Sequence, residues 1–136
     1  MRTTILGAVT ALLLSTVFVS CGGKGGGSTT PEASLVVTTT PANGKNLAAA
    51  PGPTFPLIVQ ITSVMPPKVV TISINATIDG STAAAYYTFS GSSTTAINNY
   101  VITDTPSQQT CLVTITVTSN TLSTNVWTGS YTYAMK

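Results

Sequence analysis

The sequence predicts one all-β domain, a sandwich of about seven strands that begins near residue 34. From that point apolar and polar residues alternate with period two, as they do in strands with one buried face. Turn-forming Gly, Pro, Asn and Asp residues recur roughly every 8–12 positions. No segment after residue 34 has the periodicity of a helix. The 136 residues suffice for one domain.

The expected strands are short and rich in β-branched residues. The clearest is 69–78, in which Val70, Ile72 and Ile74 alternate with Thr71 and Ser73, so that one face is buried and the other is wet. The full set of expected strands is 35–39, 55–62, 69–78, 85–90, 96–103, 111–118 and 126–135.

Turn residues separate these strands. Residues 40–44 (TPANG) end the first strand, and Asn43-Gly44 is a strong turn signal. Residues 48–53 (AAAPGP) are predicted to form a loop. Asn98-Asn99 is expected to interrupt the strand at 96–103. Further breaks are predicted at Pro66-Pro67, Asp79-Gly80, 91–93 and 104–107.

The strand number and the turn at 40–44 resemble bacterial immunoglobulin-like domains, in which a Pro-x-(Asn/Asp)-Gly turn recurs after the first strand. The resemblance implies an immunoglobulin-like Greek-key sandwich, and a fibronectin type III-like sandwich fits the same pattern. The second strand has no cysteine to pair with Cys111, and the third has no tryptophan. We therefore expect Cys111 to be a buried thiol; an intermolecular disulfide is the alternative.

The N-terminal segment has the layout of a secretory signal peptide. Arg2 supplies a positive start, residues 5–19 are apolar and uncharged, and small residues lead to Cys21. The apolar stretch is too short to be a comfortable membrane span.

The four residues Phe18-Val19-Ser20-Cys21 resemble the lipobox of bacterial lipoproteins, although Phe18 stands where Leu is usual. The resemblance implies lipid attachment to Cys21 and cleavage before it. The alternative is an ordinary signal peptide with an incidental cysteine. The implied organisation is a signal peptide at 1–20, a lipidated Gly/Ser-rich linker at 21–33 and a domain at 34–136.

Position 22 is Gly rather than the Asp that commonly retains lipoproteins at the inner membrane, so the sequence resembles those sorted to the outer membrane. The expected localisation is a lipid anchor in a bacterial membrane, with the domain either periplasmic or exposed at the cell surface.

Composition argues against catalysis and against nucleic-acid binding. Only 6% of the residues are charged, against about 25% in ordinary soluble domains, and phosphate binding needs clustered Lys and Arg. The chain has no histidine, and Glu32, Asp79 and Asp104 are dispersed. We expect no enzyme activity, cofactor or metal. A carboxylate pair of Asp79 and Asp104, or a weak calcium site on either, is the alternative.

Aromatic residues are the feature with most potential for recognition. Tyr86 is predicted to be an exposed ring, because it alternates with Tyr87 and Phe89, and Trp127 is the second possible ligand contact. Tyr87, Phe89 and the row 127–133 are expected to lie in or beside the core.

We expect a membrane-anchored, non-enzymatic structural or adhesion module that binds a protein or a surface polymer through loops or a strand edge. A carbohydrate-binding module that uses exposed aromatics is the alternative. No small-molecule substrate is expected.

Overall fold

The computed structural model describes residues 30–136, and the compact unit within them is Pro31–Lys136. The predicted signal peptide, Cys21 and most of the predicted linker lie outside the described residues, so those assignments stay predictions. Within residues 30–136, no helix is long and apolar enough to cross a membrane.

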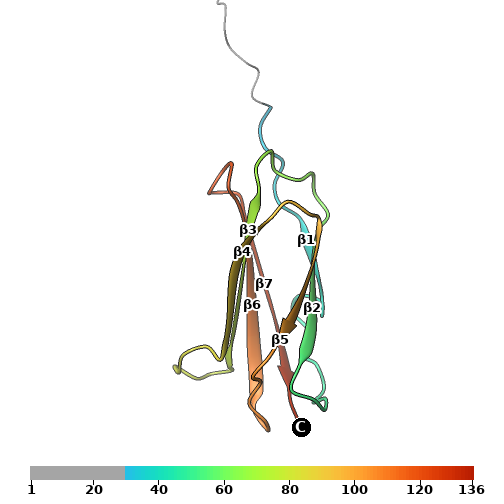
Figure 1. Cartoon of the computed structure of the whole chain (residues 1–136), viewed down its shortest axis with the longest axis vertical. Helices are drawn as coiled ribbons and strands as arrows, with labels where there is room; N and C mark the ends of the chain where they lie inside the picture. Colours follow the sequence, from blue (N-terminus) through green and yellow to red (C-terminus); the bar gives the residue numbers. More distant parts are fainter. Residues whose placement is uncertain (1–29) are drawn as a thin grey trace, which may run out of the picture. The chain divides into compact units, whose positions relative to one another are not determined.

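The domain is a sandwich of two antiparallel sheets (Figure 1). The small sheet has the order β1-β2-β5, and the large sheet has the order β4-β3-β6-β7. The strands of the small sheet are β1 (Val37–Thr40), β2 (Phe55–Ile61) and β5 (Ile97–Ile102). The strands of the large sheet are β3 (Val70–Ile78), β4 (Tyr87–Ser93), β6 (Thr110–Ser119) and β7 (Val126–Ala134).

The predicted fold class is confirmed: seven strands form an immunoglobulin-like or fibronectin type III-like sandwich. The fourth strand pairs with β3, whereas in a constant-type immunoglobulin domain it pairs with the fifth. The small sheet therefore has three strands and the large sheet four.

The core lies between the sheets and consists of the inward residues of the alternating strands. Removing each such aliphatic side chain from water contributes roughly 1.5–3 kcal/mol. The largest fully buried members, apart from Tyr133, are Leu57, Ile72, Ile74, Ile102, Ile115, Val59, Val70, Val113 and Val117.

Two expected interruptions are wrong. Residues 91–93 continue β4, because they pair with residues 70–72 of β3. The Phe89 ring lies over Gly91, where an added Cβ would be 2.7 Å from the ring. Asn98 lies within an unbroken β5, and its Oδ1 accepts a hydrogen bond from Ser93 Oγ at 2.5 Å. Asn98 therefore stabilises the short connection between β4 and β5 rather than breaking the strand.

The Asn43-Gly44 turn is confirmed, but it moves the chain from one sheet to the other. After Thr40 the chain leaves the small sheet and runs beside β7 as the crossover segment, residues 41–50. Gly44 adopts a φ of 76°, which glycine tolerates without strain, and its amide donates to Ser130 O at 2.7 Å. Leu47 N then donates to Thr132 O at 2.9 Å.

Candidate binding pocket

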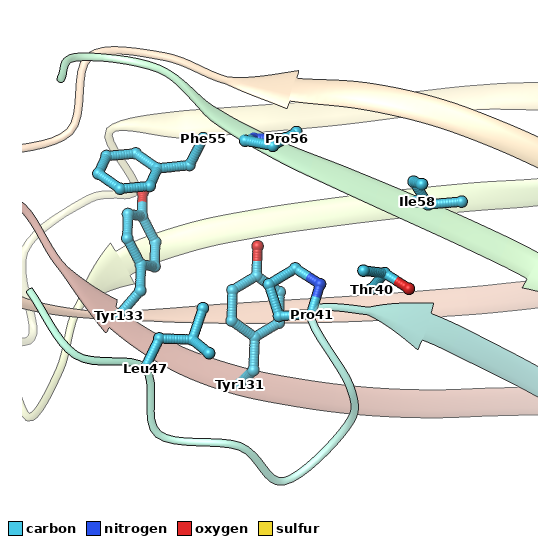
Figure 2. A pocket seen from close by; sticks show the side chains of 8 residues that line it. All are labelled: Thr40, Pro41, Leu47, Phe55, Pro56, Ile58, Tyr131 and Tyr133. Carbon is cyan, nitrogen blue, oxygen red and sulfur yellow. The ribbon is translucent and has the colours of Figure 1, made fainter. Parts of the chain in front are cut away.

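A cavity of about 250 Å³ lies where the chain crosses between the sheets (Figure 2). Its walls come from the end of β1, the crossover segment, the start of β2 and the second half of β7. The lining residues are Thr40, Pro41, Leu47, Phe55, Pro56, Ile58, Tyr131 and Tyr133.

The path of β1 explains the cavity. The last residue of β1, Thr40, pairs with Ile58, so the start of β2 has no strand beside it on that edge. Thr62 N donates to Val36 O, so the backbone N–H groups of the even-numbered residues of β2 point toward β1. The next such residue is Pro56, which has no N–H to donate. A further strand is therefore poorly supported there, whereas a side chain can enter the gap.

The pocket is uncharged and almost wholly apolar. Its buried polar atom is the hydroxyl of Tyr131, a residue that is only 3% exposed. This hydroxyl has no hydrogen-bond partner among the described residues and is directed into the space between Phe55 and Pro41 (Figure 2). Burial, followed by the nearby Tyr133, raises the pKa of Tyr131 above its ordinary value of 10.0, so the ring stays neutral.

An unpartnered buried hydroxyl costs about 1–3 kcal/mol. Because the Tyr131 oxygen has less than 1 Å² of exposed surface, a group that enters the pocket meets its apolar walls rather than this hydroxyl. The arrangement therefore suits a neutral apolar group.

Tyr133 forms the inner wall of the pocket and is held rigidly. Its hydroxyl shares hydrogen bonds with Tyr86 and with Thr105, each at 2.7 Å, and its ring lies 4.4 Å from that of Phe55. Burial raises the pKa of Tyr133, while its bonds to Thr105 and Tyr86 lower it. The network joins β7 to the β5–β6 loop and to the start of β4, so the wall is fixed from three sides.

The prediction that Tyr86 is an exposed ring is wrong. Tyr86 is half-buried and packs against the core, with its hydroxyl on Tyr133. Strand β4 begins only at Tyr87, so alternation within the strand does not set the direction of Tyr86. Burial is the first cause that raises the pKa of Tyr86, followed by Cys111 and Tyr133.

Trp127 is half-buried, and its ring covers Gly129 on the same strand. Tyr87 and Tyr100 are half-buried beside the core, as expected for Tyr87. Among the rings of residues 30–136, Phe89 alone is exposed, at 36%. The expectation that Phe89 lies in or beside the core is therefore wrong, because β4 is the edge strand of the large sheet. Tyr86 and Trp127 thus do not form an exposed surface together.

The remaining candidates do not gather into a site. Cys111 is fully buried, as predicted, it has no disulfide within residues 30–136, and its Sγ faces Gln109 O at 3.8 Å. Asp104 accepts a hydrogen bond from Thr103 Oγ1 at 2.8 Å, in keeping with a turn residue. In the described part of the chain no three His, Cys, Asp or Glu residues are grouped to hold a metal ion.

Sequence reasoning missed the pocket residues as a group. Pro41 belongs to a segment predicted only as a turn, Leu47 lies between that turn and the predicted loop at 48–53, and Phe55 was expected only as the first residue of a strand. The one local signal is Leu47, an apolar residue between a turn and a Pro/Gly-rich loop.

No known protein family, curated protein or solved structure matches the chain. The fold and the pocket are therefore the observations from which a function is proposed.

Proposed function

We propose that this protein is a lipid-anchored, non-enzymatic interaction module, and that the pocket beside the crossover segment receives an apolar side chain of a partner protein. The observation that carries the proposal is an uncharged pocket with a rigid wall that opens on the domain surface next to Ile58. Apolar anchors that fill preformed pockets contribute most of the affinity in many protein interfaces.

The outer face of the small sheet extends this site. Ile58 lies there, and Ile97 and Val101 are 55% and 52% exposed on the same face. No charged residue occurs in β1, β2 or β5. An interface core of this composition excludes water without leaving an unpaired charge.

The outer face of the large sheet is a different kind of surface. Its rows are hydroxyl residues: Ser73 pairs with Ser90 on one side and with Thr116 on the other, and Thr116 pairs with Thr128. Such a face is well solvated, so the small-sheet face is the better candidate for a partner.

The anchor rests on the residues around Cys21. The lipobox-like sequence supports lipid attachment at that cysteine, and Gly22 supports sorting to the outer membrane. Several acyl chains hold a protein on a bilayer far longer than one chain does.

The anchor is tested by Cys21→Ser with metabolic labelling by a fatty acid. Loss of the label and release of the protein from membranes are expected. Unchanged label with unchanged membrane partitioning would refute the anchor.

The interaction site is tested by a photo-crosslinking residue placed at Ile58 in cells that express the full chain. We expect one discrete protein adduct from position 58 and none from position 116, the matched site on the large sheet. Leu47→Asp should abolish the adduct, and Thr116→Asp should preserve it. Equal adducts from both positions, or an adduct indifferent to Leu47→Asp, would remove the pocket from the proposal.

A carbohydrate-binding module needs a flat row of exposed rings. Phe89 is the one exposed ring in residues 30–136, so no observation favours this alternative.

A further inference from the structure

The linker joins the domain at one defined end. Asn125, in the β6–β7 turn, donates through Nδ2 to Glu32 Oε1 at 2.6 Å and to Ala33 O at 2.9 Å. Its Oδ1 accepts from Leu35 N at 2.9 Å. These three bonds hold the first residues of the domain against that turn.

We call the end of the domain formed by residues 32–35 and the β6–β7 turn the linker end (Figure 1). The β2–β3 connection lies there as well, because Lys68 N donates to Thr121 Oγ1 at 3.1 Å and Asn120 N donates to Val69 O at 3.1 Å. The far end carries the β3–β4 and β5–β6 loops, the last part of the β1–β2 connection and the C-terminus.

Exposed apolar side chains concentrate at the linker end. Val64 in the β2–β3 connection is 76% exposed, and Leu122 in the β6–β7 turn is 46% exposed. Val36 and Val126 are exposed beside them. At the far end, the β3–β4 and β5–β6 loops, residues 79–86 and 103–109, carry none of the large apolar side chains that the described chain exposes, and the β1–β2 connection carries one, Leu47, at 40%. Burial of such loop tips stabilises contact with an apolar phase.

Charge has a matching distribution. Asp79 and Asp104 lie in the far-end loops and are exposed, and Lys136 at the C-terminus of the same end is exposed as well. Glu32 at the linker end is half-buried and bonded to Asn125, while Lys68 at the same end is exposed. Among the described residues, the linker end therefore presents an exposed cation and no exposed carboxylate side chain to anionic headgroups, whereas the far end presents exposed charges of both signs.

The length of the linker limits the distance to a lipid on Cys21. Nine residues, 22–30, separate Cys21 from Pro31. Even fully extended they span only about 30 Å, at roughly 3.3–3.6 Å per residue. If Cys21 carries lipid, the linker end of the domain stays within about 30 Å of the bilayer.

We propose that the linker end docks on the lipid bilayer, with Val64 and Leu122 in the interface and Lys68 among anionic headgroups. This inference rests on the proposed lipid anchor. Docking orients the domain so that the pocket is held away from the membrane, because Phe55 in its wall pairs with Ile102, beside the far-end β5–β6 loop. The partner site of the proposed function would then be open to the surrounding space.

The chain supplies its own probe, because Trp127 is its one tryptophan and is the second residue of β7, next to the linker-end turn. The lipidated full-length protein is reconstituted into vesicles of phosphatidylcholine and phosphatidylglycerol, with and without brominated acyl chains. We expect brominated lipid to quench Trp127 fluorescence. The double variant Val64→Asp/Leu122→Asp should reduce this quenching several-fold.

The matched control is Ala83→Asp/Ser107→Asp, which adds the same two charges at the far end and should leave quenching unchanged. Circular dichroism and the midpoint of thermal unfolding are measured for each variant, and variants with a wild-type fold are compared. Lys68→Glu should weaken quenching in vesicles that contain phosphatidylglycerol and not in pure phosphatidylcholine.

Flotation of the vesicles tests the proposed lipid anchor separately from the proposed docking of the linker end. Wild-type protein that fails to float refutes the anchor. Protein that floats but shows no quenching, or equal quenching in wild type and in Val64→Asp/Leu122→Asp, refutes the docking and leaves the anchor intact.

Discussion

The two open sides of the sandwich are closed in different ways. On the β4–β5 side a short turn joins the sheets, and the rings of Phe89 and Tyr100 meet with their centroids 4.8 Å apart. On the β1–β7 side the crossover segment spans the gap, and a cavity of about 250 Å³ remains beneath it, where the hydroxyl of Tyr131 has no partner within residues 30–136.

Both sides have aromatic residues, so ring content does not account for the difference. The path of the chain does. Strands β4 and β5 each stay in one sheet to their ends, and their side chains meet across the gap. Strand β1 ends at Thr40, so no strand pairs with the start of β2 on that edge, and no side chain fills the space there. A close-packed domain thus acquires a pocket where a strand changes sheets.

The largest expected effect is at Tyr133, whose ring forms the inner wall of the pocket on the β1–β7 side. Tyr133→Ala should lower the free energy of unfolding by about 3–5 kcal/mol, because it leaves a large core cavity. Tyr133→Phe keeps the ring but leaves Tyr86 and Thr105 without their shared partner, and should cost about 1–3 kcal/mol. Urea unfolding monitored by circular dichroism measures both. Equal costs for the two variants would mean that the ring itself contributes little.

Substitutions on the β4–β5 side should cost less stability, because the Phe89 ring on that side is partly exposed to solvent. Phe89→Ala should cost about 2 kcal/mol, below the range for fully buried Phe residues. Gly91→Ala should cost less, because the new methyl displaces the Phe89 ring. Val101→Ala on the outer face of the small sheet is the control, with an expected change within about 0.5 kcal/mol. A Phe89→Ala cost no larger than that of the control would show that the Phe89 ring does not stabilise the β4–β5 side.

Tyr131→Phe should have the opposite sign to Tyr133→Phe. It removes a buried hydroxyl that has no partner among the described residues, so the free energy of unfolding should rise by about 1 kcal/mol. A loss of stability equal to that of Tyr133→Phe would mean that Tyr131 has a hydrogen-bond partner in solution.

The smallest effect is expected from pH, and only in alkali. Burial is the main cause that raises the pKa of Tyr86, Tyr131 and Tyr133 in the folded state above the ordinary value of 10.0. A raised folded-state pKa contributes stability that is fully present below about pH 10 and is lost as the pH rises further. Stability should therefore be flat from pH 7 to about 9. Ultraviolet titration should show that these rings ionise only as the domain unfolds, and early ionisation of all tyrosines would contradict this.

Local patterns were enough to predict the seven strands and their buried faces. In β3 and β6 every second residue is apolar, and burial follows that alternation along most of each strand. Gly91 could not be interpreted in this way, because its role depends on a ring two residues away that lies across it. Tyr86 failed for a related reason, since it precedes β4 and turns inward to Tyr133.

The sequence by itself determined the fold class, the buried faces and the absence of charge from every strand, because each of these follows from residues adjacent along the chain. It also predicts the lipid anchor at Cys21, which lies outside the described residues. Only the tertiary structure decided where the crossover segment leaves a pocket, which hydroxyls find partners, and which end of the domain gathers exposed apolar side chains. These features depend on contacts between residues far apart along the chain, and an alternating pattern contains no information about such contacts.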